Sequence, residues 1–172
     1  GVTEENDVEN TFVGATGIYC GVSDILENNT LTDTGFTAEY KDEKIFIPAQ
    51  MLEKVISGAE VSVSDTKATL TYSGAAYTFA ENSTKCEKDS AVEGIKFAPY
   101  KKNGSLYISA EDLFRVLNVP CYIYGRLILT GDESLIESIK NKTNHNLNTY
   151  AEDVIKIICA DTEKALSGVD CD

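Results

Sequence analysis

The sequence predicts an α+β fold in which two copies of a strand–helix–strand pattern form the halves of one sheet, with further helices at the C-terminus. The copies begin at Lys44 and at Ser105, and this spacing defines the repeat offset. In both, apolar residues alternate along the strand segments and recur at helical spacing between them. Together the copies span residues 44–124, which is too short for two separate domains. We therefore expect one sheet that is covered by helices.

The first copy starts with a strand that leads into a two-turn amphipathic helix. Residues 44–47 show the alternation that is typical of a strand. Pro48 suits the first helical position, because the N–H group that proline lacks would have no partner there. Gly58 suits the left-handed conformation that ends many helices. The apolar face of the predicted helix consists of Leu52, Val55 and Ile56.

Two strands and a turn are expected after this helix. One strand is predicted to begin at Val61 and to continue through Tyr72, because apolar residues alternate along most of this segment. Ser73 and Gly74 are typical of a tight turn. The chain is then expected to return in a strand that contains residues 77–79.

The second copy repeats this design with different polar residues. Residues 105–108 alternate like a strand, and Ser109 is a favourable N-cap. Asp112, three residues later, completes a capping box with a short side chain. Asn118 takes the place of Gly58, because asparagine tolerates the left-handed conformation. The matching apolar face consists of Leu113, Val116 and Leu117, and a closing strand or hairpin is expected around Gly125.

Three segments are predicted along the chain. Residues 1–35 form an N-terminal extension with one or two short strands and a turn-rich connection at its end. Residues 36–131 form the domain that contains both copies, and residues 132–172 form a helical C-terminal segment. Within that segment, helices are expected over 134–142 and 149–166. Their apolar stripe must pack on the sheet or on a partner.

The charge of the chain limits its partners. The 172 residues carry a net charge of −13, and the first forty contain eight acidic and no basic side chains. Phosphate groups would be repelled, so nucleic acids and anionic membrane surfaces are unfavourable partners. No stretch reaches the roughly 18 consecutive apolar residues that a membrane span needs. We therefore predict a solvated acidic surface and no membrane insertion.

The first copy resembles the signature of the copper amine oxidase-like N-terminal domain, which usually occurs twice in a chain. The matching residues of the first copy are Ile47, Pro48, Leu52, Val55, Gly58, Ala59 and Val61. The second copy matches more loosely, at Ile108, Leu113, Leu117 and the strand over 121–124. The chain lacks the strand tryptophan of the family, and the usual arginine and the second proline are replaced by Met51, Asp112 and Ser109.

The resemblance covers about residues 36–131 and implies a twisted antiparallel sheet wrapped around a helix. It also implies a non-catalytic structural or adaptor domain, stalk-like, in a secreted or cell-wall-associated protein of Gram-positive bacteria. We expect that a signal peptide has already been removed. The implied partner is a neighbouring domain or a cell-surface protein or glycan. Despite its name, the family carries no copper and no oxidase chemistry, so no cofactor is expected.

The residues themselves also give little support to an active site. The single histidine is His145, whereas a copper amine oxidase centre typically needs three imidazole ligands. A nucleophilic pair of His145 with Cys20, Cys86 or Cys159 remains open, although His145 lies in a polar segment without a catalytic motif. The five cysteines lack metal-binding spacing, and reduced thiols are expected at Cys121 and Cys159, which have apolar neighbours. We therefore predict no enzyme activity, no catalytic residue and no metal ligand.

Binding through tyrosines is the alternative to a purely structural role. The chain has nine tyrosines, and their rings can stack on a glycan or on a partner protein. Tyr122 and Tyr124 are two residues apart and so share one face of a strand. Packing beneath a helix or the C-terminal tail is the competing interpretation. The candidate surface of a glycan- or peptidoglycan-binding module consists of Tyr100, Tyr122 and Tyr124.

Overall fold

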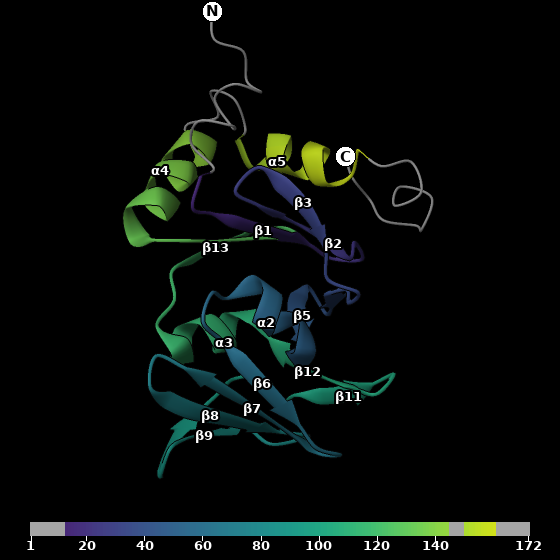
Figure 1. The fold of residues 1–172 in the computed structure, drawn as a ribbon, viewed down its shortest axis with the longest axis vertical. Helices are drawn as coiled ribbons and strands as arrows, with labels where there is room; N and C mark the ends of the chain where they lie inside the picture. The colour runs from purple at the N-terminus through teal and green to yellow at the C-terminus, as the bar shows by residue number, and fades with distance from the viewer. Residues whose placement is uncertain (1–12, 145–149, 161–172) are drawn as a thin grey trace, which may run out of the picture. The chain divides into compact units, whose positions relative to one another are not determined.

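The computed structural model describes residues 13–144 and 150–160, which form a mixed α+β fold with antiparallel sheets (Figure 1). The predicted α+β class is thereby confirmed. The chain divides into two compact units: unit 1 is Gly1–Ala38 with Val119–Asp172, and unit 2 is Glu39–Asn118. Unit 2 is therefore a continuous insertion into unit 1.

Unit 1 is built on a sheet whose strands come from both sides of the insertion. Their order is β13-β14-β1-β2-β3. The central strands β1 and β14 are antiparallel, with Thr16 opposite Thr130 and Tyr19 opposite Leu127. The elements of unit 1 are β1 (Thr16–Tyr19), β2 (Asp24–Glu27), β3 (Thr30–Asp33), β13 (Cys121–Tyr124), β14 (Leu127–Thr130), α4 (Glu133–Asn144) and α5 (Tyr150–Ile158).

A hairpin of β2 and β3 replaces the turn-rich connection that the sequence suggests. Asn28 and Asn29 have positive φ values of 47° and 67°, a conformation that asparagine adopts more readily than most residues. Leu31 pairs with Leu26 across the hairpin. The expectation of an irregular segment is wrong here, because only the two asparagines turn and the residues after them form a strand.

The helices α4 and α5 pack on one face of the unit 1 sheet (Figure 1). Tyr150, Val154 and Ile158 of α5 are at most 1% exposed. The apolar stripe predicted for the C-terminal helices therefore packs on a sheet of the same chain. The second predicted helix, over 149–166, ends earlier than expected, at Ile158; its predicted part beyond residue 160 lies outside the described residues. The residues packed against the helices are Tyr19, Leu26, Leu127 and Leu129 of the strands, and Ala15 and Val22 of the segments that flank β1.

Unit 2 contains the first strand and the helix of both copies of the repeat, each as a hairpin followed by a helix. The expectation that both copies form one sheet is wrong for their closing strands, because β6 and β13 lie in two other sheets and β13 belongs to unit 1. The first hairpin consists of β4 (Glu39–Lys41) and β5 (Lys44–Pro48), and the second of β11 (Tyr100–Lys102) and β12 (Ser105–Ser109). The hairpins join through β5 and β12 into a sheet of order β11-β12-β5-β4. The first strand of each hairpin thus lies at an edge of this sheet.

A pseudo-two-fold axis relates the two copies. Ile47 and Ile108 occupy the same position in the repeat and lie opposite each other in β5 and β12. Next to them, Phe46 lies opposite Ser109. The hairpin turns repeat at the same offset, and positive φ values occur at Asp42, Glu43, Asn103 and Gly104. The structural repeat therefore includes β4 and β11, which precede the first residues of the two sequence copies, Lys44 and Ser105.

The helix of the second copy follows the prediction. α3 (Ala110–Leu117) has Ser109 as its N-cap, whose side chain accepts a hydrogen bond from the Asp112 N–H. Asn118 ends the helix in the left-handed conformation, with φ 56°. α3 packs against β5 and β12, and Leu113 and Phe114 are at most 1% exposed. The cap and the apolar face are thus where the sequence places them.

The helix of the first copy is shorter than expected. A 3-10 turn, η1 (Ala49–Met51), leads into a single α-helical turn, α2 (Leu52–Val55). Pro48 is the residue before this turn, with an extended backbone, and not its first helical residue. Gly58 is left-handed with φ 83°, as predicted, but α2 ends at Val55, before the chain reaches this glycine.

The second sheet of unit 2 is a five-stranded meander in the order β10-β9-β8-β7-β6. The single strand predicted from Val61 to Tyr72 is wrong, because the chain turns at residues 64–66 and the Ser64 N–H donates to the Lys67 carbonyl. Serine and aspartate favour such turns. The strands are β6 (Glu60–Val63), β7 (Lys67–Tyr72), β8 (Ala75–Ala80), β9 (Lys85–Lys88) and β10 (Ala91–Gly94).

Two cysteines differ in their chemistry. Cys159, after the end of α5, is disulfide-bonded, so the reduced thiol expected there is wrong. Cys86 is a fully buried thiol on β9. Burial, with a smaller contribution from the nearby carboxylates of Glu93 and Glu87, raises its pKa to about 11.

Cys86 is therefore expected to resist alkylation in the folded protein. At pH 8 the thiolate form, which is the nucleophile, is scarce, and the sulfur is not accessible. A pulse of iodoacetamide followed by peptide mapping should leave Cys86 unmodified. The same pulse in concentrated urea, as the control, should modify it fully. Rapid labelling of the native protein would contradict the buried position.

Candidate functional site

One face of the four-stranded sheet of unit 2 carries aromatic and charged side chains around Tyr100. The strand register pairs Tyr100 with Tyr107, and Phe46 with Glu39. Residues two apart on a strand share a face, which adds the lysines that follow on the edge strands. These six residues, called the Tyr100 cluster, are Glu39, Lys41, Phe46, Tyr100, Lys102 and Tyr107.

The ring of Tyr100 is in contact with three neighbours. It is stacked on Tyr107, with ring centroids 5.3 Å apart and an interplanar angle of 3°. Phe46 meets it edge-on at 5.0 Å. The ammonium group of Lys41 lies over the ring, 4.1 Å from its centroid. Stacked, edge-on and cation–π contacts are all favourable geometries for an aromatic ring, so each of these neighbours stabilises the position of Tyr100.

Glu39 links this aromatic group to the edge strand β11. It accepts a hydrogen bond from the Tyr100 hydroxyl at 2.5 Å and forms an ion pair with Lys102. Partial burial acts to raise the pKa of Glu39, but hydrogen bonds from Lys102 and Tyr100 and the charges of Lys102 and Lys41 outweigh it. The net result is a pKa below the ordinary value of 4.5.

The Tyr100 cluster follows the pseudo-two-fold symmetry of the repeat. Glu39 and Tyr100 are equivalent positions, and so are Lys41 and Lys102. The contact of Lys41 with Tyr100 is thus the counterpart of the contact of Lys102 with Glu39. Both contacts join β4 to β11, the two edge strands of the sheet. The cluster therefore holds the two copies together.

Replacing Glu39 with glutamine is expected to lower the free energy of unfolding by about 0.2–1 kcal/mol at pH 7, the usual range for an accessible ion pair. Because the folded protein lowers the pKa of Glu39, its contribution is present above the unfolded value of 4.5 and is lost as the pH falls through the folded pKa. Urea unfolding at pH 7 and pH 3 measures the difference.

Lys102→Met provides the matched control for this ion pair. It should cost about as much as E39Q at pH 7, and the double variant should cost little more than either single change. An E39Q effect of equal size at pH 3 and pH 7 would show that the ion pair does not stabilise unit 2.

Tyr122 and Tyr124 lie on one face of β13, with ring centroids 6.4 Å apart. Both are partly buried against the core of unit 1. The Tyr124 hydroxyl donates to Glu152 of α5 at 3.0 Å. Burial raises the pKa of both phenols, and the Glu152 carboxylate raises that of Tyr124 further. These two tyrosines thus pack beneath a helix.

The three candidate tyrosines do not form one surface within either unit. Tyr100 belongs to unit 2, whereas Tyr122 and Tyr124 belong to unit 1. The charged neighbours of Tyr100 were not among the sequence candidates. The repeat offset could have identified them, because it places Glu39 at the position of Tyr100, and Lys41 at that of Lys102.

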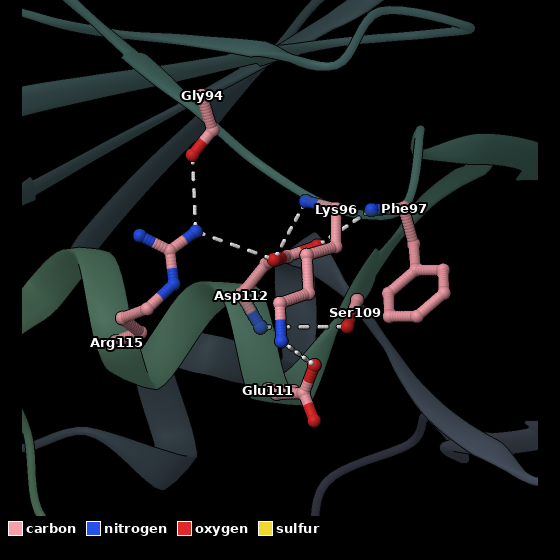
Figure 2. Close-up of polar contacts among 7 residues, drawn as sticks. All are labelled: Gly94, Lys96, Phe97, Ser109, Glu111, Asp112 and Arg115. Carbon is pink, nitrogen blue, oxygen red and sulfur yellow. Dashed lines mark hydrogen bonds and ion pairs between the residues drawn. The ribbon is translucent and has the colours of Figure 1, made fainter.

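A second group of polar side chains surrounds Asp112 at the start of α3 (Figure 2). Its carboxylate is 0% exposed. One oxygen accepts the Lys96 N–H and the other the Phe97 N–H, both at 2.9 Å. The Arg115 guanidinium lies 3.4 Å from the carboxylate and also donates to the Gly94 carbonyl. The residues of this Asp112 cluster are Gly94, Lys96, Phe97, Ser109, Glu111, Asp112 and Arg115.

The Asp112 cluster fixes the connection between β10 and β11 to the first turn of α3. Only one of the two hydrogen bonds of the predicted capping box is therefore formed by these side chains: the Ser109 hydroxyl accepts the Asp112 N–H. The Asp112 carboxylate binds the connection instead. Lys96 adds an accessible ion pair with Glu111 at 3.5 Å. The arrangement binds backbone groups of its own unit and so positions the hairpin that carries Tyr100.

No family model, curated protein or solved structure matches the chain. In the part of the chain that the structure describes, no group of three or more histidine, cysteine, aspartate or glutamate side chains could hold a metal ion. No helix of that part is long and apolar enough to cross a membrane. His145, the partner of the Cys–His pair left open by the sequence, lies outside the described residues.

Proposed function

We propose that the chain is a non-catalytic structural or adaptor domain, stalk-like, of a secreted or cell-wall-associated bacterial protein. The observation that carries this proposal is that the clustered polar side chains bind groups of the protein itself. In the Tyr100 and Asp112 clusters, the carboxylates of Glu39 and Asp112 bind groups of unit 2 itself. Carboxylates whose partners lie in the same unit stabilise the fold of that unit.

The doubled hairpin and helix supports the resemblance to the copper amine oxidase-like N-terminal domain. The finer arrangement proposed for unit 2 is a twisted antiparallel sheet wrapped around a helix, with α3 as that helix. The contacts of α3 with β5 and β12 favour it. The departures from the family at Met51 and Asp112 are consistent with a structural role, because Met51 is fully buried and Asp112 holds a loop.

An extracellular or wall-associated location is part of the proposal. The disulfide at Cys159 favours it, because such bonds persist in oxidising compartments. The proposed partner is a neighbouring domain or a cell-surface protein or glycan. Stacking of a glycan on Tyr100 is less well supported, because the ring already contacts Tyr107 and Lys41.

The test combines a turnover assay and a binding assay. Purified protein is incubated with amines and with cell-wall polysaccharide, and is passed over insoluble peptidoglycan. A stalk-like domain should show no turnover and no retention above that of an unrelated acidic protein. Turnover that one side-chain change abolishes would refute the proposal. Retention that Tyr100→Ala or Tyr122→Ala abolishes would favour the glycan-binding alternative.

A further inference from the structure

We propose that the chain lengthens under tension in two ordered steps, in which unit 1 opens first and unit 2 unfolds only afterwards. This inference rests on the proposed stalk-like function, in which a pull between the chain ends is the natural load. It follows from the connectivity of the two units together with the geometry of the contacts that close unit 1.

The connectivity keeps tension away from unit 2 while unit 1 is intact. The chain enters unit 2 after Ala38 and leaves it before Val119, and both flanking segments belong to unit 1. The Ala38 carbonyl accepts the Gly21 N–H at 2.9 Å, and the Pro120 carbonyl accepts the Thr130 hydroxyl at 2.9 Å. Both ends of the insertion are thus held close to the paired strands β1 and β14.

The ladder of β1 and β14 carries the load between the two halves of unit 1. It is antiparallel, with Thr16 opposite Thr130. Tension from the N-terminus enters β1 at Thr16, and tension from the C-terminus reaches β14 at Thr130. Both forces act at the same end of the ladder. The paired residues therefore separate one after another, and no more than one pair resists at a time.

The helices of unit 1 are loaded in the same way. α4 and α5 lie between Thr130 and the C-terminus, so tension reaches the far end of α5 first. That helix packs on β1 and β2 through Val154, Ile155 and Ile158. A pull on its end removes these contacts in sequence. Unit 1 therefore opens by peeling throughout.

Unit 2 then becomes the second element of the tether. Once β1 and β14 separate, tension passes through Glu39 and Asn118, the ends of unit 2. When unit 2 unfolds, its extended chain lengthens the tether by at most about 290 Å, at roughly 3.6 Å per residue. When unit 1 opens, its residues between 13 and 160 lengthen the tether by at most about 240 Å on the same basis. The tether thus lengthens in a first step while unit 2 stays folded, and unit 2 supplies the second step.

Single-molecule stretching of the full chain, with handles at both ends, tests this order. Two extension steps are expected, the first from unit 1. A disulfide between Lys67→Cys and Ala80→Cys, which lie opposite each other in β7 and β8, identifies the unit 2 step. It closes the loop between these strands and should shorten the second step by roughly 45 Å. A shortened first step, or a single step for the whole chain, would overturn the proposal.

The variant Asp112→Asn tests whether the order of opening is set by the connectivity of the units or by their relative stability. This change weakens unit 2 and leaves unit 1 untouched. If connectivity sets the order, unit 1 still opens first at an unchanged force, and the second step occurs at a lower force. A reversed order in the variant would refute the proposal. The turnover assay does not depend on this measurement, so a failure of the stalk-like function and a failure of the ordered opening are distinguishable.

Discussion

Replacing Asp112 with alanine should destabilise unit 2 by about 3–5 kcal/mol. The fully buried carboxylate accepts the N–H groups of Lys96 and Phe97, and each loses its partner when the carboxylate is removed. A hydrogen bond to a charged group is worth roughly 1.5–3 kcal/mol. The buried volume of the side chain is also left unfilled. Native-state hydrogen exchange of the β5 and β12 amides measures the change within unit 2.

Two further variants distinguish this effect from a general loss of charge. Asp112→Asn keeps one carbonyl acceptor and should cost less than the alanine change. Glu111→Gln, at the neighbouring accessible position, removes only an ion pair with Lys96 and should stay within about 0.5 kcal/mol of the original protein. If D112A behaved like E111Q, the two backbone hydrogen bonds would not hold the loop in solution.

The local part of the fold could be predicted because its signals lie close together in sequence. The N-cap at Ser109, the left-handed Asn118 and the turn at Ser73–Gly74 each depend on a few neighbouring residues. The repeat offset also predicts the symmetry of the strands, since Ile47 and Ile108 are equivalent residues that pair with each other. Periodicity and turn residues thus account for β5, β8, β12 and α3 of unit 2.

The remaining features depend on contacts between distant residues. Nothing near Cys121 in the sequence shows that β13 and β14 join β1, which lies on the other side of the insertion, since the residues on either side can form a hairpin alone. The shortness of α2 is likewise not encoded in its apolar spacing, which suits two turns.

The candidate site was predictable only in part, for a related reason. Tyr100 is recognisable as an aromatic residue on a strand, but its neighbours depend on the strand register. Glu39 is distant in sequence and reaches Tyr100 because β4 and β11 are the edges of the same small sheet. The carboxylate of Asp112 suits a helix cap in the sequence, and only the path of the loop before β11 assigns it to Lys96 and Phe97.

Replacing Val154 with aspartate should unfold unit 1 and leave unit 2 folded. Val154 is 0% exposed and lies in the apolar cluster between α5 and the sheet. A carboxylate there has no partner among the apolar side chains of that cluster, and an unpaired buried charge costs roughly 3–5 kcal/mol. Hydrogen exchange should show loss of protection in β1 and β14, with β5 and β12 unchanged.

Lys156→Asp is the matched control, because it places the same side chain at an exposed position of the same helix. Its effect should stay within about 1 kcal/mol, since the aspartate remains in water and removes only the favourable charge of Lys156 in the last turn of α5. Equal effects of the two variants would mean that α5 does not pack on the sheet. Loss of protection in both units with V154D would mean that they unfold as one. That outcome would also remove the basis for opening in two steps, because the order under tension requires that unit 2 stay folded when unit 1 is lost.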